Sequence, residues 1–142
     1  MTMTETAVGP VPAAPYIKYG PGGDLHIEAL RCEACGAASL RSHAACRNCG
    51  SRKGQRAYVA PNSGTLEQWT VVERSFPGVK VPFVSAIVRL DDGPLLKGVL
   101  RGIDPDPEAI KVGQKVKVVF DDANGAVDKA GNPYVCFFFE PA

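Results

Sequence analysis

Four cysteines in two tight pairs constrain the fold of this chain more than any other feature of its sequence. Cys32 and Cys35 form one Cys-x-x-Cys pair, Cys46 and Cys49 form the other, and residues 36–45 separate the pairs. Each such turn directs two sulfurs towards one point, so two turns supply the four thiolates of a tetrahedral zinc ion. Four protein ligands leave no coordination position for a substrate. We therefore expect the four cysteines to bind a structural zinc.

Other interpretations of the cysteines fit less well. A disulfide framework needs an oxidising compartment, and the chain starts without the basic and apolar regions of an export signal, so we expect a cytoplasmic protein. A thioredoxin-type pair would be a single motif at the start of a helix, whereas each pair here is followed by a glycine, Gly36 or Gly50. Iron in the same thiolate site would give an electron carrier, which remains the alternative to zinc.

The charge of the chain is balanced overall but unevenly distributed. Its 142 residues contain 16 lysines and arginines against 15 aspartates and glutamates, a length that suits one modest core and one metal-bound module. Residues 31–56 are basic and are opposed only by Glu33, which indicates contact with an anion or ordinary solvated charge. No apolar run approaches the roughly 18 residues of a membrane span. The basic residues of this segment are Arg31, Arg41, Arg47, Arg52, Lys53 and Arg56.

The first 24 residues are rich in proline and glycine, a composition that opposes both helix formation and strand pairing. We therefore predict an N-terminal arm over residues 1–24. Tyr16, Ile17 and Tyr19 are more apolar than a solvated tail requires, so the arm is expected to contact a partner or the protein's own surface.

The rest of the sequence predicts β-structure in two parts. A ribbon is expected over residues 25–61, with strands at 25–31 and 57–60 on either side of the cysteine pairs. A second domain is expected over residues 62–142, because alternating β-branched residues and turn residues follow each other there without helical periodicity. Its five predicted strands are 64–74, 83–90, 95–101, 115–121 and 134–140.

This second domain has the pattern of an OB-fold barrel. Asp92-Gly93-Pro94 predicts a tight hairpin turn between the second and third strands, and residues 106–111 predict a single helical turn before the fourth. Five short strands with a short helical insert at that point are typical of an OB barrel. A sandwich usually needs more strands, and a doubly wound sheet needs helices that the sequence lacks. The predicted fold class is therefore mostly β.

The order of these motifs resembles one known family. The knuckles Cys32-x-x-Cys35-Gly36 and Cys46-x-x-Cys49-Gly50 precede Ser63-Gly64-Thr65-Leu66, then the Asp91-Asp92-Gly93-Pro94-Leu95 hairpin and a Gly-x-x-Val-x-Val-x-Phe strand at 113–120. This order is similar to the acyl-CoA-associated family that joins a rubredoxin-like zinc ribbon to an OB fold, long classed as a domain of unknown function. The resemblance covers about residue 25 to the C-terminus. The chain departs from many relatives by starting with an arm in place of one or two helices.

The resemblance implies a role in acyl-CoA chemistry. Members of the family are small partner subunits of thiolase-like enzymes, and some pair with hot-dog-fold hydratases. We therefore expect a non-catalytic subunit of a thiolase-type acyltransferase complex that completes the CoA passage of its partner, in aromatic, steroid or fatty acyl-CoA degradation. The alternatives are a partner of an enoyl-CoA hydratase and a single-stranded nucleic-acid-binding OB module. The acidic residues beside the barrel aromatics argue against nucleic acid.

The residues themselves do not indicate independent catalysis. His26 and His43 lie near no obvious nucleophile, and Cys136 belongs to an apolar strand where a thiol is expected to pack in the core. CoA shared with the partner would meet basic groups at its phosphates and aromatic groups along its pantetheine arm. Each aromatic has an equally good interpretation as a core residue. The candidate CoA contacts are Arg47, Arg52, Lys53, Trp69 and Phe76.

Overall fold

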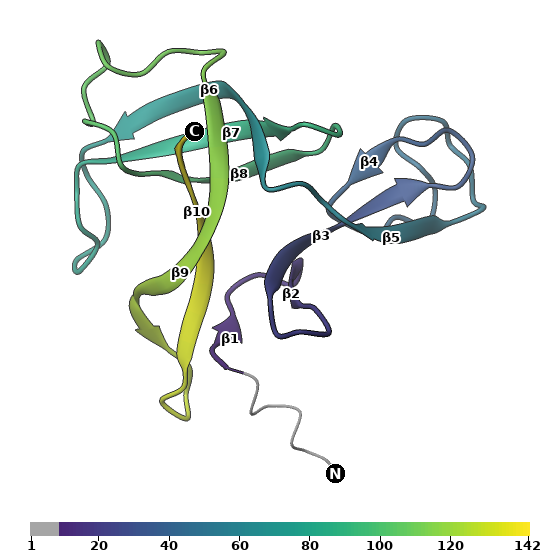
Figure 1. Cartoon of the computed structure of the whole chain (residues 1–142), viewed down its shortest axis with the longest axis horizontal. Helices are drawn as coiled ribbons and strands as arrows, with labels where there is room; N and C mark the ends of the chain where they lie inside the picture. Colours follow the sequence, from purple (N-terminus) through teal and green to yellow (C-terminus); the bar gives the residue numbers. More distant parts are fainter. Residues whose placement is uncertain (1–8) are drawn as a thin grey trace.

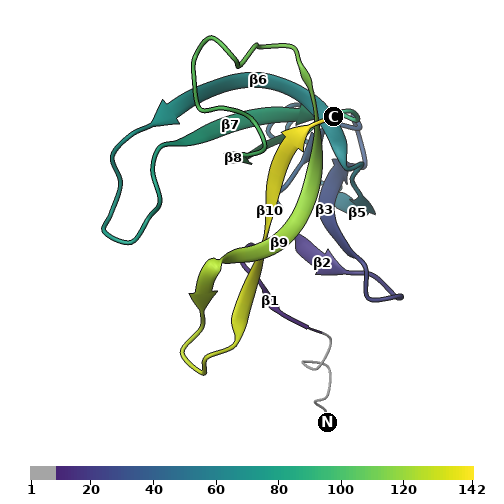
Figure 2. The same ribbon diagram turned by 60° about the vertical axis from the view of Figure 1, so that its left-hand side comes forward.

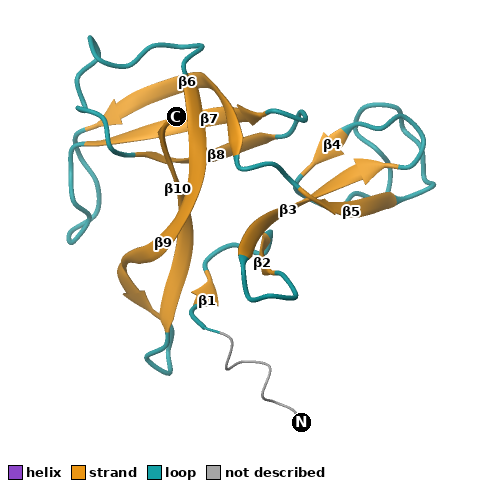
Figure 3. Cartoon of the chain, viewed as in Figure 1, coloured by secondary structure: helices purple, strands orange, loops and turns teal. Residues whose placement is uncertain are grey.

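The computed structural model describes residues 9–142, which form ten β-strands and no α-helix (Figures 1 and 3). None of the described residues forms a helix of the length and apolarity that crossing a membrane requires. The strands are β1 (Val11–Pro12), β2 (Ile17–Tyr19), β3 (Leu25–Cys32), β4 (Ala38–Ser39), β5 (Gln55–Val59), β6 (Ser63–Val72), β7 (Phe83–Leu90), β8 (Leu95–Leu100), β9 (Lys115–Val127) and β10 (Pro133–Pro141).

Strands β6 to β10 close into a five-stranded barrel. Antiparallel hairpins join β6 to β7 and β7 to β8, while β8 pairs in parallel with β10 at Leu100 and Phe139. Antiparallel pairing of β10 with β9, and of β9 with the start of β6, closes the ring. This connectivity is that of an OB fold, so the predicted fold class is confirmed.

The predicted barrel strands agree with the observed ones except at the end of β9. That strand continues to Val127, beyond the predicted end at residue 121, because its hairpin with β10 curls outward past an irregularity near Val135. The predicted helical turn before β9 is a single hydrogen-bonded turn. Its backbone N–H of Ala109 donates to the carbonyl of Asp106 at 2.8 Å, and Ile110 beside it is buried.

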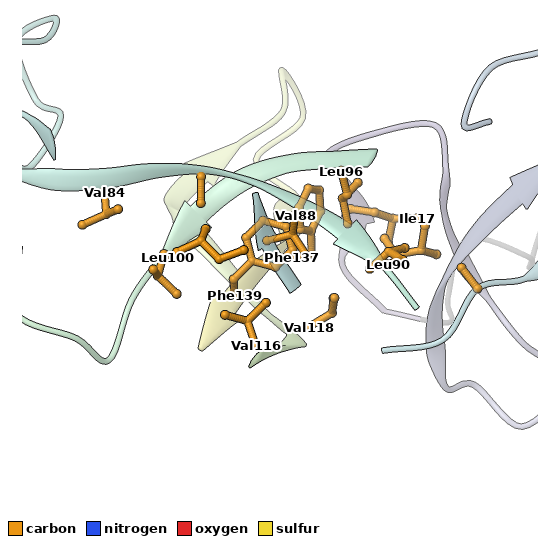
Figure 4. Close-up of a cluster of buried hydrophobic side chains, with 14 of the residues drawn as sticks. Ile17, Val84, Val88, Leu90, Leu96, Leu100, Val116, Val118, Phe137 and Phe139 are labelled. Carbon is orange, nitrogen blue, oxygen red and sulfur yellow. The ribbon is translucent and has the colours of Figure 1, made fainter. Parts of the chain in front are cut away.

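The barrel interior is filled by alternate side chains of its strands. In β7 every second residue from Val84 to Leu90 is buried, as expected for a strand with one face on a core. Figure 4 shows Phe137 and Phe139 within the buried cluster, and their rings meet edge to face with centroids 5.7 Å apart. Gly98 in β8 is needed there because a Cβ on it would lie 2.6 Å from the ring of Phe137.

A second, smaller sheet forms the ribbon around the long strand β3. One end of β3 pairs with β2, and its other end pairs with β4 and β5 (Figure 1). The buried cluster of the barrel continues into this sheet through Ile17, Ile27 and Ala29. The base of the ribbon therefore shares one hydrophobic core with the barrel, whereas β4, β5 and the loops between them project away from it (Figure 1).

The prediction that the proline-rich arm avoids strand pairing is wrong for part of its length. Residues 11–12 pair in parallel with β10, and residues 17–19 pair with β3. Proline is tolerated in β1 because it is an edge strand, and burial of Ile17 in the shared core anchors β2. The arm is expected to contact either a partner or the protein's own surface. Its described part contacts the protein's own surface. Residues 1–8 of the predicted arm lie outside the described residues.

Candidate metal centre

The two Cys-x-x-Cys-Gly segments fold into matching knuckles at the far end of the ribbon. In the first, the N–H of Gly36 donates to the carbonyl of Cys32 at 3.0 Å; in the second, the N–H of Gly50 donates to that of Cys46 at 2.8 Å. Both glycines have positive φ angles, 79° and 78°, which side-chain-bearing residues rarely adopt. The local sequence therefore determines each knuckle, and the pairing of β3 with β5 brings the two together.

The four sulfurs of the knuckles are arranged as a tetrahedral metal requires. Cys32 Sγ lies 3.8 Å from Cys49 Sγ, Cys35 Sγ lies 3.7 Å from Cys46 Sγ, and all four lie within 4.8 Å of one another. Four Zn–S bonds of about 2.3 Å at tetrahedral angles place the sulfurs about 3.8 Å apart, whereas a disulfide needs about 2.05 Å. The donor set fits one zinc or iron ion and leaves no ligand position open. Zinc as the resident metal stays a prediction.

Amide groups aimed at the sulfurs favour the thiolate forms. The backbone N–H groups of Ala34 and Asn48 donate to Cys32 and Cys46 at 3.4 and 3.3 Å. The side-chain amide of Asn48 and the backbone N–H of Ala37 donate to Cys35 and lower the pKa of that thiol to about 6.

The thiols of the cluster do not all favour the thiolate form. The backbone N–H of Ser51 lowers the pKa of Cys49, but desolvation and the neighbouring sulfurs outweigh it and raise that pKa to about 11. Without a metal, the cluster thus favours the thiolate form at Cys35 and disfavours it at Cys49. A divalent cation at the centre removes this conflict because it attracts all four thiolates at once.

A polar contact links the first knuckle to the barrel. Arg31 in β3 donates from Nη1 to the carbonyl of Gly36 at 2.7 Å and from Nη2 to Asp92 in the β7–β8 turn at 3.3 Å, and its guanidinium lies 4.7 Å from the centre of the Tyr58 ring. Burial and the nearby carboxylate of Asp92 raise the pKa of Tyr58 to about 12. The tyrosine hydroxyl and Asp92 Oδ1 are both buried, and among the described residues neither forms a hydrogen bond of good geometry.

The predicted CoA contacts do not form a single site. Arg47, Arg52 and Lys53 are exposed on the ribbon. Phe76 is 82% exposed in the loop between β6 and β7, at the opposite end of the molecule from the ribbon (Figures 1 and 2). Trp69 is half-buried and packs against the hydrophobic cluster, as its interpretation as a core residue expects. One CoA molecule therefore cannot be assumed to touch all five residues.

The open face of the barrel has a groove of about 710 Å³ beside the β6–β7 loop. Lys80 and Arg101 line this groove, and Arg101 stacks on Phe138 with 4.4 Å to the ring centre. The same guanidinium pairs with Asp121 and Glu140, each at 3.0 Å. Because two carboxylates neutralise the guanidinium, Arg101 offers little attraction to a phosphate backbone.

Cys136, the fifth cysteine, lies half-buried in β10 and packs against the core cluster. Burial raises the pKa of its thiol, which keeps it in the unreactive protonated form at neutral pH. Asn48, Arg31 and Asp92 are the residues around the metal centre that sequence reasoning did not single out. The basic residue directly before the first cysteine and the asparagine inside the second knuckle were the available signals.

Comparison with known proteins places the barrel in a described family. Residues 57–121 match the family model described as "ChsH2, C-terminal OB-fold domain". The chain is also similar to a chain of the solved Ltp2-ChsH2(DUF35) aldolase, with 26% identity and a TM-score of 0.63 over 82% of this chain and 84% of that one. A DUF35-family protein of unknown function from Sulfolobus solfataricus gives 18% identity and a TM-score of 0.49, covering 78% and 75% of the two chains. No curated protein sequence matches the chain significantly.

Proposed function

This chain belongs to the DUF35 family of proteins with a ChsH2-type OB fold, and from that premise we propose that it is a non-catalytic subunit of an enzyme complex acting on acyl-CoA thioesters. The observation that supports this most is the similarity to a chain of the Ltp2-ChsH2 aldolase over more than four-fifths of both chains. By this analogy the present chain binds a catalytic partner and forms a hetero-oligomer with it.

The proposed chemistry is the making or breaking of a carbon–carbon bond beside a carbonyl group. An aldolase cleaves a β-hydroxy carbonyl compound into two carbonyl compounds. A thiolase cleaves a 3-ketoacyl-CoA with a second CoA, giving two shorter thioesters. Both reactions need a base or nucleophile in a site that excludes water. We propose that a thiolase-like partner supplies these groups, and that this chain lines the entrance through which the CoA thioester passes.

The thiols of this chain support an accessory role. Four of them surround the metal centre, and tetrathiolate coordination leaves no position for substrate. The fifth, Cys136, has a pKa raised by burial, the opposite of what an activated nucleophile requires. The metal supplies structure in this proposal, by joining the two knuckles through their thiolates.

Purification of the tagged chain from its native extract tests the proposal. We expect a thiolase-like protein to co-purify, and the complex to cleave a 3-ketoacyl-CoA or a 3-hydroxyacyl-CoA while this chain alone cleaves neither. Hydration of an enoyl-CoA by the complex would instead identify a hydratase partner. Turnover of any of these thioesters by the isolated chain would refute the accessory role. Two cysteine variants serve as controls in this experiment. Cys46→Ser removes a sulfur of the metal centre, whereas Cys136→Ser removes a thiol outside it, so a loss of partner binding only in Cys46→Ser would be due to the ribbon.

A further inference from the structure

A groove between the ribbon and the β7–β8 hairpin has basic side chains on both walls. The β7–β8 turn reaches towards β4 in Figure 1, and the groove there has a volume of about 430 Å³. The ribbon contributes Arg41, His43 and Arg47, and β7 contributes Arg89. Among the described residues, no aspartate or glutamate lines this groove, although the chain as a whole is almost neutral.

The two aspartates of the hairpin turn and the carboxylate next to Arg89 already have cationic partners. Asp91 lies 3.8 Å from the Lys115 ammonium, Asp92 pairs with Arg31, and Glu67 pairs with Arg89 at 3.3 Å. Within residues 9–142, neither Arg41 nor Arg47 forms an ion pair. Two permanently charged guanidinium groups therefore face one groove without a protein anion between them, and an external anion would stabilise them.

The backbone that presents these side chains is held in place. The Gln55 side chain accepts from the His43 N–H and donates to the His43 carbonyl, both at 3.0 Å, and Ser39 Oγ donates to the Arg41 carbonyl at 3.1 Å. On the opposite wall, Arg89 Nη1 donates to the Gly93 carbonyl at 2.9 Å. The backbone of the ribbon wall and the Arg89 side chain are thus held in place before a ligand arrives, which reduces the entropy lost on binding.

Apolar side chains complete the groove. Leu40, Pro94 and Leu95 line it beside the basic groups, and Leu95 is 47% exposed although it lies in a barrel strand. A ligand with phosphate groups at one end and a less polar ring at the other would match this surface. The volume falls in the range of small-molecule sites, about 300–1,000 Å³.

We propose that this groove binds the phosphate groups of a nucleotide, with Arg41 and Arg47 as the principal ligands and Arg89 and His43 opposite or beside them. Guanidinium groups bind phosphate oxygens through paired hydrogen bonds. The nucleotide would be either the phosphorylated end of a CoA thioester or a free nucleoside diphosphate. The inference rests on the proposed function for the choice of CoA as ligand, but not for the existence of the site.

Titration calorimetry of the full, metal-loaded chain with four probes tests the inference. We expect saturable binding of adenosine 3′,5′-bisphosphate, CoA and ADP, and none of adenosine, with affinity that decreases as salt increases. Tighter binding of CoA and the 3′,5′-bisphosphate than of ADP supports CoA as the source, and the reverse order supports a free nucleoside diphosphate. Equal binding of adenosine, or no saturable binding of any phosphate, overturns the site.

Two double variants, each of which removes two positive charges, distinguish a specific phosphate site from a general electrostatic attraction. Arg41→Ala with Arg47→Ala should weaken binding by about tenfold or more, because it removes both unpaired guanidinium groups. Arg74→Ala with Lys129→Ala removes two charges from exposed positions of the barrel outside the groove and should leave affinity within about twofold. If both double variants weaken nucleotide binding equally, the inference is overturned. Metal content, measured in each variant, must stay unchanged, and co-purification of a partner is a separate readout of the proposed function.

Discussion

Removal of the metal should unfold the outer ribbon while the barrel stays folded. Within residues 33–55 only Cys46 is buried, so almost no hydrophobic burial opposes the conformational entropy of about 1–2 kcal/mol per residue. Structural zinc contributes about 10–16 kcal/mol to the folding of zinc-finger peptides. The barrel, in contrast, has its own buried core around Leu66, Val88 and Phe139. The metal is therefore expected to be the main source of stability for the knuckles.

The structure also predicts the size of the metal site. The two shortest sulfur separations, 3.7 and 3.8 Å, match those expected around an ion that lies about 2.3 Å from each of four sulfurs. X-ray absorption of the purified protein should show four sulfur neighbours at about that distance. The Cys46→Ser variant should show either a metal with three sulfur neighbours or no bound metal. The Cys136→Ser variant should bind one metal per chain, as the parent does.

Hydrogen exchange measures the unfolding directly. After chelation, the Gly36 and Gly50 amides that close the knuckles should exchange like those of an unstructured peptide. Amides of β7 and β10 should keep their protection. Knuckle amides that remain protected without metal would refute the reasoning, and so would a barrel that unfolds together with the ribbon.

Three further predictions concern single residues. Gly98→Ala should lower the free energy of unfolding by about 1–3 kcal/mol, measured by chemical denaturation, because its Cβ would lie 2.6 Å from Phe137. Adding Phe137→Leu should recover part of that loss, and strict additivity would contradict the packing argument. Ultraviolet titration should show Tyr58 ionising near pH 12, and this signal should be absent in Tyr58→Phe. Because the folded-state pKa of Tyr58 exceeds the ordinary value of 10.0, its contribution to stability is complete below pH 10 and is lost as pH rises towards 12. Cys136 should react with iodoacetamide at pH 8 more slowly in the native than in the denatured protein, because burial raises its pKa.

The sequence by itself determined the four-cysteine cluster and most of the barrel strands. Both depend on short-range patterns: Cys-x-x-Cys-Gly specifies a turn within five residues, and alternation of apolar residues specifies which face of a strand is buried. The hairpin at Asp92-Gly93-Pro94 was predictable for the same reason, since a tight turn is determined by its own residues. Local hydrogen bonds and φ angles in the structure agree with these patterns.

Only the tertiary structure decided which distant residues meet. The pairing of β1 with β10 joins Val11 to Tyr134, and no composition rule for a proline-rich segment identifies that partner. The contact of Arg31 with Asp92 spans 61 positions, and the basic groove joins Arg47 of the ribbon to Arg89 of the barrel. Such proximity results from strand register and from the core shared between ribbon and barrel, which are properties of the whole folded chain and not of any short segment.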